Sequence, residues 1–210
     1  MIKMLVKEMK FRDIDKHYFF IENINCVKKI YKKLHLKKEI HPLLVYGFID
    51  HEKGITFRIL GNVIIENDIS KLEDEFIKNT YILEYDFLEN YDMKEVPENV
   101  AFKIVGVSAI ENEIDSNYKN TGLLKSRNNE QLDQYRDIRL IDDVQFLLLS
   151  REAQEEDVWA RIDEEEENGL LKCTLLDDVN SKFNLKKNDK IYIKYVEHPK
   201  YKGLMFVRKI

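Results

Sequence analysis

The sequence is poor in cysteine, proline and glycine, and it has no long apolar run. Its 210 residues include only two cysteines, three prolines and seven glycines. Cys26 and Cys173 lie far apart, each within an apolar pattern, so we expect two buried free thiols and a reducing compartment rather than a disulfide. No apolar run reaches the ~18 residues that a membrane-spanning helix needs, and residues 1–7 lack the apolar core of a secretion signal. We therefore expect a cytoplasmic protein that does not interact with a membrane.

The sequence also lacks the motifs of several large enzyme classes. Its scattered glycines never form Gly-x-Gly-x-x-Gly or a Gly-Lys-Ser/Thr loop, which are common cradles for nucleotide phosphates. It has no Cys-x-x-Cys and no His-Glu-x-x-His, and its five histidines do not have the spacing of a metal site. No serine lies in a nucleophile elbow. We therefore assign no catalytic, cofactor-binding or metal-binding residue and favour a non-enzymatic protein, while an enzyme with a site assembled from distant residues stays open.

Apolar residues, in contrast, are abundant: they make up 44% of the chain and include eleven Phe and eleven Tyr. That content argues for a folded core rather than for disorder. Apolar residues at helical spacing predict an amphipathic helix over about residues 14–36. Its apolar face holds Phe20, Ile24, Val27, Tyr31 and Leu34. Its opposite face holds Lys28, Lys29, Lys32 and Lys33. Such a lysine face is either simply solvated or available to phosphate groups.

Strand patterns follow this helix. The apolar runs 43–49 and 55–60, which are joined by a turn that ends in glycine, predict a β-hairpin. Ser70 and Glu73 form a Ser-x-x-Glu capping box, which predicts a helix after them. The run 100–107 predicts a central strand.

The C-terminal part of the chain has the pattern of a small β module. Alternating apolar residues predict four short strands, at 158–162, 170–176, 190–196 and 204–207. Gly169 can supply the positive φ that a hairpin return often needs between the first two strands. Several short strands separated by turn residues predict a small antiparallel sheet or a partly open barrel.

The order of motifs in this module resembles that of a known family. A strand opens at Trp159, a glycine and a Leu-x-x-x-Leu-Leu-Asp-Asp return strand come next, and Leu185-Lys-Lys-Asn-Asp-Lys-Ile-Tyr-Ile follows. In this respect the stretch from Val144 to Val196 resembles the YegJ-like family of bacterial domains (domain of unknown function 2314). Asn188 stands where that family usually has glycine, and His198-Pro-Lys-Tyr replaces its usual Ile-x-Asp-Trp ending. The resemblance implies a similar fold and a bacterial origin, and it implies no reaction.

We predict an α+β fold: an antiparallel sheet of hairpins with the N-terminal amphipathic helix, plus a smaller C-terminal β module. The least periodic and most polar stretch lies near the middle of the chain. We therefore divide the chain into an N-terminal α+β lobe at 1–111, a polar connector with room for a short helix at 112–136, and a β-rich lobe at 137–210. The residues 81–91 fit a strand or an exposed aromatic and acidic surface, and 137–150 fit a helix or a strand.

The net charge of −5 conceals blocks of opposite sign. Residues 1–40 carry a net charge of +6 and residues 182–210 carry +7, whereas 62–99 carry −8 and 151–168 carry −7. The blocks either pair with one another across the fold, or one of them presents a charged face to a partner of opposite sign.

An acidic face suits a basic partner, because charge complementarity accelerates association and sets specificity. Our first hypothesis is therefore a non-enzymatic bacterial or phage binding protein, most simply an immunity protein or inhibitor that covers a basic toxin or nuclease. We expect Glu164, Glu165, Glu166 and Glu167 to contact that partner, with Trp159 beside them either as an aromatic anchor or as a core residue. The alternative is a nucleic-acid-associated accessory protein that uses the basic helix and the Lys- and Tyr-rich C-terminus.

Overall fold

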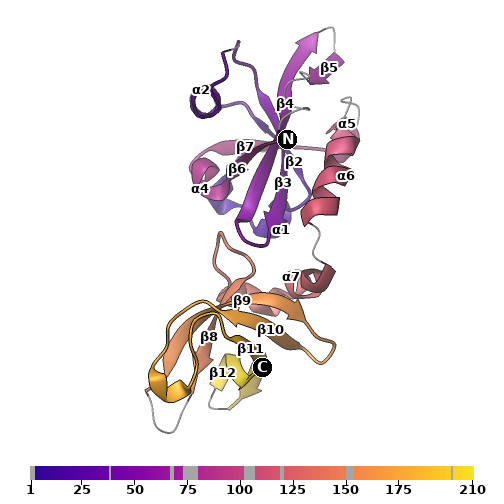
Figure 1. Ribbon diagram of the computed structural model, residues 1–210. Helices are drawn as coiled ribbons and strands as arrows, with labels where there is room; N and C mark the ends of the chain where they lie inside the picture. The colour runs from indigo at the N-terminus through magenta and orange to yellow at the C-terminus, as the bar shows by residue number, and fades with distance from the viewer. Residues whose placement is uncertain are drawn as a thin grey trace. The chain divides into compact units, whose positions relative to one another are not determined.

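The protein divides into two compact units, Met1–Lys119 and Asn120–Ile210, which Figure 1 shows with their elements labelled. The computed structural model describes residues 3–37, 39–66, 69–72, 80–101, 107–118, 121–149, 154–199 and 201–210. Whether each unit folds as an independent domain, with lobes and connector bounded as the sequence suggests, stays a prediction.

The first unit is built on an antiparallel sheet with the strand order β1-β7-β2-β3-β4-β5, in which β6 also pairs with β4. The strands are β1 Lys3–Leu5, β2 Tyr18–Ile21, β3 Leu43–Asp50, β4 Gly54–Glu66, β5 Ile69–Leu72, β6 Tyr81–Glu84 and β7 Asp92–Val96. The predicted hairpin of 43–49 and 55–60 is confirmed, because β3 and β4 pair along their length from Asp50↔Gly54 to Leu43↔Asn62.

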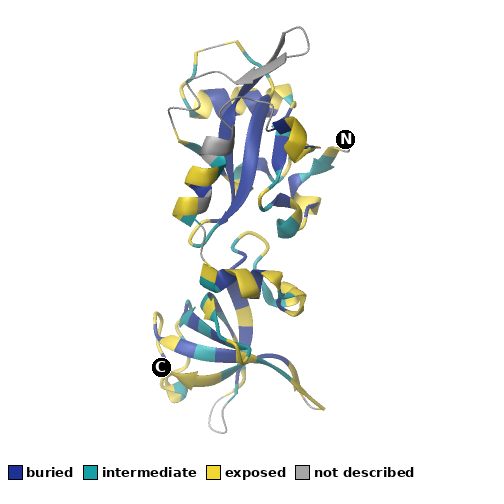
Figure 2. Ribbon diagram, turned by 90° about the vertical axis from the view of Figure 1, so that its right-hand side faces the viewer, coloured by how far each residue is buried: buried dark blue, intermediate teal, exposed yellow. Residues whose placement is uncertain are grey.

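Helices lie on both faces of this sheet, with α6 on one side and α2 and α4 on the other (Figure 1). They are η1 Val6–Glu8, α1 Phe11–Ile14, α2 Ile24–Lys33, α4 Tyr85–Leu88, α5 Glu98–Ala101 and α6 Val107–Tyr118. Burial from both sides explains why β3 is a continuous apolar run, buried from Leu43 to Ile49. Figure 2 shows these central strands in dark blue.

The helix predicted over about residues 14–36 is wrong in its extent. Tyr18–Ile21 form β2, which lies between β7 and β3 and has Tyr18, Phe19 and Ile21 buried. Bulky aromatic and β-branched residues suit a strand buried on both faces, so their apparent helical spacing was coincidental. Helix α2 begins only after Asn23, whose side-chain oxygen accepts from the backbone N–H groups of the two residues Asn25 and Cys26, at 3.1 and 3.2 Å.

In the middle of the first unit, the structure also differs from what the sequence pattern predicted. Ser70 lies in β5, and the helix predicted after it falls on residues 73–79, outside the described residues. The ambiguous stretch 81–91 contains the strand β6 followed at once by the short helix α4.

The strand predicted over 100–107 is wrong where that stretch is described. The carbonyl of Pro97 accepts from the backbone N–H groups of Val100 and Ala101, at 2.8 and 3.0 Å, and this turn makes α5. Residues 102–106 lie outside the described residues, and Val107 already belongs to α6. The residues 112–118, predicted as the start of a polar connector, form most of α6.

The second unit is a closed five-stranded barrel with the order β10-β11-β12-β8-β9. Its strands are β8 Asp143–Leu148, β9 Glu156–Glu165, β10 Leu170–Leu175, β11 Lys190–His198 and β12 Tyr201–Lys209. Sequential strands pair antiparallel, so the first and the fifth run in the same direction and close the barrel as a parallel pair. That closure pairs only Met205 with Leu147. The barrel is thus closed rather than partly open, and the ambiguous stretch 137–150 contains a strand.

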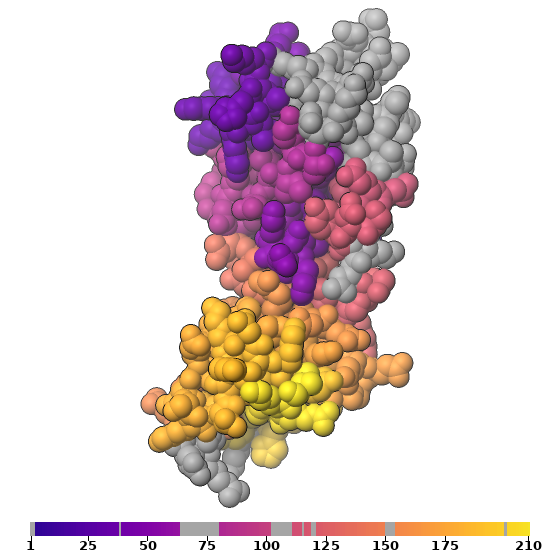
Figure 3. Space-filling view, viewed as in Figure 1, coloured from indigo at the N-terminus to yellow at the C-terminus, as the bar shows by residue number. Residues whose placement is uncertain are grey.

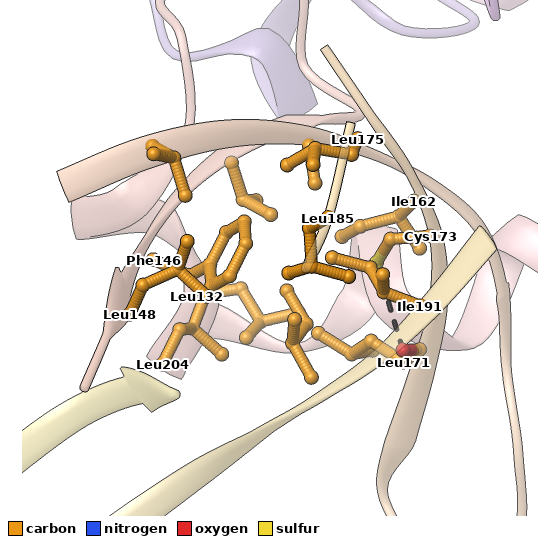
Figure 4. Close-up of a cluster of buried hydrophobic side chains, with 14 of the residues drawn as sticks. Leu132, Phe146, Leu148, Ile162, Leu171, Cys173, Leu175, Leu185, Ile191 and Leu204 are labelled. Carbon is orange, nitrogen blue, oxygen red and sulfur yellow. Dashed lines mark hydrogen bonds between the residues drawn. The ribbon is translucent and has the colours of Figure 1, made fainter. Parts of the chain in front are cut away.

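Alternate residues of the strands fill the barrel (Figure 4). The fully buried members of this cluster include Leu148, Ala160, Ile162, Cys173, Leu175, Ile191 and Ile193. Cys173 and Cys26 are both buried and free, which confirms the expectation of two buried thiols. Burial raises the pKa of Cys26 to about 12 and that of Cys173 well above its ordinary value, so both thiols stay protonated and unreactive.

Two arginine–carboxylate pairs stabilise the second unit: one joins the short helices before β8 to the start of that strand, and the other joins β8 to β9. The short helices are η2 Thr121–Leu123, α7 Leu124–Asn128 and η3 Glu130–Tyr135, and a further turn, η4 Ser181–Phe183, precedes β11. Arg127 Nε and Nη2 lie 3.0 and 2.6 Å from the two carboxylate oxygens of Asp142, and both side chains are buried. Arg161 meets Asp143 in the same bidentate way, at 2.6 and 3.0 Å. These pairs are strong because two parallel hydrogen bonds join opposite charges.

Candidate functional site

Trp159 lies on the outer side of β9. Its neighbours Val158 and Ala160 are buried in the barrel, whereas Trp159 itself is half-buried. The main chain at this point is fixed, because the Trp159 N–H donates to a carboxylate oxygen of Asp177 at 2.7 Å and its carbonyl accepts from the N–H of Leu176 at 2.9 Å. The strand therefore holds a large aromatic ring at the barrel surface rather than in its core.

A hollow of about 290 Å³ lies at the seam where β8 and β12 pair at a single position. Gln145, which lines the hollow, is the cross-strand neighbour of Trp159. Asp157, two residues before Trp159, lines it from β9. The buried residues Phe146 and Leu204 also contribute to its lining.

We call the surface around this hollow the seam face. It comprises the lining residues Tyr135, Leu147, Asp157, Tyr201 and Met205, and we add Trp159 as the cross-strand neighbour of the lining residue Gln145. A Cβ atom at Gly203 would lie 3.2 Å from the hydroxyl oxygen of Tyr135, so glycine lets that ring approach the β12 backbone closely. Burial raises the pKa of the Tyr135 hydroxyl above its ordinary value. On the rim, Lys202 pairs with Glu197 at 2.9 Å.

The four glutamates expected to form one acidic patch have different environments. Glu164 and Glu167 are exposed. Glu166 is partly engaged, since one of its carboxylate oxygens accepts from the hydroxyl of Tyr192 at 2.6 Å. The side chain of Glu165 is only 6% exposed. Only Glu164 and Glu167 are therefore fully presented to solvent.

A β-bulge turns Glu165 inward. The register between β9 and β10 shifts between Lys172 and Cys173, so β9 has one more residue than its partner there. Beyond the bulge, Glu165 is the cross-strand neighbour of Leu171, which is buried in the barrel. Without the extra residue, strict alternation would have reversed which of these glutamates face the solvent.

The carboxylate of Glu165 lies among cations but is incompletely bonded. Lys125 Nζ is 4.0 Å from one carboxylate oxygen, and the other oxygen has no hydrogen-bond partner among the described residues. Burial raises the pKa of Glu165, and the charges of Lys125 and Arg136 oppose that effect. Lys125 also donates to the backbone carbonyl of Glu166 at 2.9 Å, which fixes the start of the turn.

Trp159 and the glutamate run do not form one cluster. Trp159 lies opposite Gln145 of β8, whereas Glu164 lies opposite Lys172 of β10. Five residues of extended strand separate Trp159 from Glu164, or roughly 16 Å. The seam face and the exposed glutamates are thus two places on the barrel, and the sequence pattern did not separate them.

Two carboxylates of this unit pair with lysines of its basic block, residues 182–210. Asp163 accepts from Lys190 Nζ and from the hydroxyl of Thr174, each at 2.9 Å. Asp189 pairs with Lys209 at 2.6 Å, and this hydrogen bond lowers the pKa of Asp189. Some of the charged side chains that the sequence suggested for contact with a partner therefore form ion pairs within the protein instead.

Comparison with protein-family models, with curated proteins and with solved structures found no match to this chain. The resemblance to the YegJ-like family therefore stays a prediction.

Two further observations bear on the kind of site. Among the described residues, no three or more His, Cys, Asp or Glu side chains lie close enough together to hold a metal ion. Within the same residues, no helix has the length and apolar character that crossing a membrane requires. The seam face was not predictable from local pattern, because it depends on the pairing of β8 with β12, which lie far apart in the sequence.

Proposed function

We propose that the protein is a non-enzymatic binding protein and that its seam face docks an extended segment of a partner protein. The observation that carries this proposal is the hollow at the barrel seam, which Tyr135, Tyr201 and Met205 line. Trp159 is the cross-strand neighbour of its lining residue Gln145. Tryptophan, tyrosine and methionine are enriched where protein interfaces bury their energetically dominant contacts. A half-buried Trp159 offers a large apolar area at little cost in side-chain entropy.

The size of the hollow indicates what it takes up. Its volume of about 290 Å³ lies at the lower limit of small-molecule sites, which span about 300–1,000 Å³. A single large apolar side chain of a partner would fill much of it and contact Phe146 and Leu204. Asp157 on its lining favours a basic group beside that side chain.

An immunity protein or inhibitor of a basic partner is the class that this arrangement supports best. Asp157, Glu164 and Glu167 are exposed carboxylates of the same strand and turn. Exposed charges raise the association rate even when they lie outside the contact area, while an aromatic anchor that is buried in the complex slows dissociation. Fast association and slow dissociation together are what a stoichiometric inhibitor needs.

Photo-crosslinking from position 147 tests this proposal. A photoreactive phenylalanine derivative replaces Leu147, and in a matched sample it replaces Lys182, an exposed residue of η4. We expect one basic protein of the native host lysate to be crosslinked from position 147 and not from position 182. Equal yields from both positions, or no protein crosslinked from either, would contradict docking at the seam face. Inhibition of the purified partner at a one-to-one ratio would then identify the inhibitor class.

A nucleic-acid-associated function is the second candidate, and one observation favours it. Register aligns Lys172, Tyr192 and Arg208 in a row across β10, β11 and β12. The Arg208 guanidinium lies 5.1 Å from the centre of the Tyr192 ring, and the last residues of β12 lie on the surface that Figure 3 shows in yellow. The carboxylate of Glu166 accepts from the Tyr192 hydroxyl, and this negative charge beside the row disfavours the binding of phosphate groups there.

Salt dependence separates the two candidates. Binding to nucleic acid releases counterions, so affinity falls steeply as salt rises. Fluorescence anisotropy with single-stranded and double-stranded oligonucleotides should show at most weak binding at physiological salt under the first proposal. Tight binding that Arg208→Ala abolishes would favour the second.

A further inference from the structure

Lysines near α2 have aromatic partners, in contrast to lysines at the edge of the same sheet. Lys3 and Lys94 both reach the carboxylate of Glu22, at 2.9 and 3.3 Å. Lys29 instead donates to the hydroxyl of Tyr91 at 2.6 Å. The positive charge near α2 is therefore not neutralised in the way that it is at the sheet edge.

Two lysines of α2 face two aromatic residues at and just after α4. Lys29 and Lys33 are one helical turn apart, and Phe87 and Tyr91 have the same spacing. The Lys33 ammonium lies 4.8 Å from the centre of the Phe87 ring, and the Lys29 ammonium lies 5.3 Å from that of Tyr91. Such cation–π contacts hold both ammonium groups in place without cancelling their charge.

Lys7 adds a third ammonium group at the same place. Its Nζ donates to the side-chain oxygen of Asn90 at 3.3 Å. In the part of the chain that the structure describes, Lys7, Lys29 and Lys33 form no ion pair with a carboxylate. Their charges remain available to an anion.

An open hollow of about 480 Å³ separates these groups. It is lined by Lys29, Asp86, Phe87, Asn90 and Tyr91. Its volume lies within the range of about 300–1,000 Å³ that small-molecule sites occupy. Only Lys29 among the three lysines lines the hollow, while Lys7 and Lys33 each contact a lining residue. The carboxylate of Glu89 also contacts a lining residue, because it accepts from Asn90 at 3.0 Å.

We propose that this hollow binds the phosphate group of a small phosphorylated ligand. Lysine is a compact point charge that binds phosphate readily, and a phosphomonoester carries nearly two negative charges at neutral pH. The three ammonium groups outnumber the two carboxylates at the hollow, those of Asp86 and Glu89, by one, so its surroundings carry a net positive charge. Their arrangement around one hollow suits a small ligand better than a nucleic-acid strand, which needs cations spaced along a groove. The site belongs to the first unit and does not depend on docking at the seam face.

Titration with three probes at constant ionic strength tests this proposal. Inorganic phosphate, adenosine monophosphate and adenosine are added to the full-length protein, and binding is followed by backbone amide NMR and by calorimetry. We expect both phosphate-bearing probes to shift amide signals of α2 and α4, and adenosine to leave them unchanged. Tighter binding of adenosine monophosphate than of inorganic phosphate would place part of the organic group in the hollow as well.

Charge variants test the individual residues. Lys29→Gln and Lys33→Gln should each weaken phosphate binding about tenfold, because each removes one charge-assisted contact. Lys53→Gln makes the same charge change on the β3–β4 turn and should leave affinity unchanged. Asp86→Asn removes the lining carboxylate and should strengthen binding several-fold, a gain that partial unfolding cannot produce.

Three outcomes would overturn the proposal. The first is that neither phosphate-bearing probe shifts the α2 and α4 signals. The second is that Lys53→Gln weakens binding as much as Lys29→Gln, since the effect would then be one of overall charge. The third is that only oligonucleotides bind, with an affinity that falls steeply with salt.

Discussion

The buried ion pairs of the second unit and the lysines around the hollow of the first unit use charge differently, and the difference separates charges that hold the fold from charges that can serve a ligand. In the second unit, buried Asp142 meets Arg127 in a bidentate pair, and similar pairs recur around the barrel. In the first unit, Lys29 and Lys33 lie over aromatic rings next to an open hollow. A paired buried charge is costly to disturb, whereas a solvated lysine can be exchanged with little loss.

Breaking the buried pair should have the largest effect on stability. Asp142→Ala leaves the Arg127 guanidinium, whose side chain is 8% exposed, without its carboxylate. We expect a loss of about 3–5 kcal/mol in the free energy of unfolding, as is typical when one partner of a buried ion pair is removed. Urea unfolding of the full-length protein measures this loss.

The double variant Asp142→Leu with Arg127→Met is the matched control. It removes both charges and should recover much of the stability, because no uncompensated charge remains in the barrel. If Asp142→Ala lowered the free energy of unfolding by less than about 1 kcal/mol, which is what an exposed pair contributes, this buried pair would not stabilise the fold more than surface charges do.

The exposed glutamates should affect association rather than stability. Substituting both Glu164 and Glu167 by Gln should slow association with a basic partner several-fold at low salt, with little change in dissociation. Stopped-flow or surface-binding kinetics at two salt concentrations measure this effect. Glu165→Gln is the control and should leave the association rate unchanged, because its side chain is buried.

Glu165 itself should respond to pH in the opposite sense to most carboxylates. Burial raises its pKa in the folded protein above the unfolded value, so the folded state binds the proton more tightly. Its favourable contribution is complete below the unfolded pKa and is lost as pH rises through the folded pKa. Glu165→Gln should therefore flatten the fall in stability with rising pH and should not destabilise the protein at neutral pH.

Urea midpoints measured from acidic to neutral pH check this expectation, with Glu164→Gln as the exposed control. A loss at neutral pH comparable to that of Asp142→Ala would show that the ions Lys125 and Arg136 outweigh the cost of burial.

The smallest effect is expected at the barrel surface. Asp163→Asn removes the partner of Lys190, whose side chain is 50% exposed. Such a pair contributes about 0–1 kcal/mol, so the urea midpoint should move little. A loss as large as that of Asp142→Ala would show that surface and buried pairs contribute alike here.

Local pattern predicted those parts of the fold that depend on neighbours in the sequence. The hairpin β3–β4 and the barrel strands follow from alternating apolar residues. Tyr18–Ile21 were misassigned because their place between two strands is a long-range property. The inward turn of Glu165 depends on one extra residue in β9, which no pattern within that strand reveals.

The candidate sites were less predictable for the same reason. Trp159 could be singled out as the one tryptophan. The hollow at the barrel seam depends on the pairing of β8 with β12, and the site in the first unit depends on the contact of Lys33 with Phe87. Side chains that meet only in the folded chain leave no local spacing to recognise.

The most direct test of the docking surface is the affinity of the crosslinked partner for Leu147→Glu compared with Leu124→Glu. Both leucines belong to the second unit, but only Leu147 lines the hollow, whereas Leu124 is exposed on α7. We predict that Leu147→Glu weakens binding by about 2 kcal/mol or more, roughly thirtyfold, as a hot-spot residue does, while Leu124→Glu binds like the unmodified protein. Equal affinity of the two variants, with unfolding midpoints showing that both are folded, would contradict docking at the seam face.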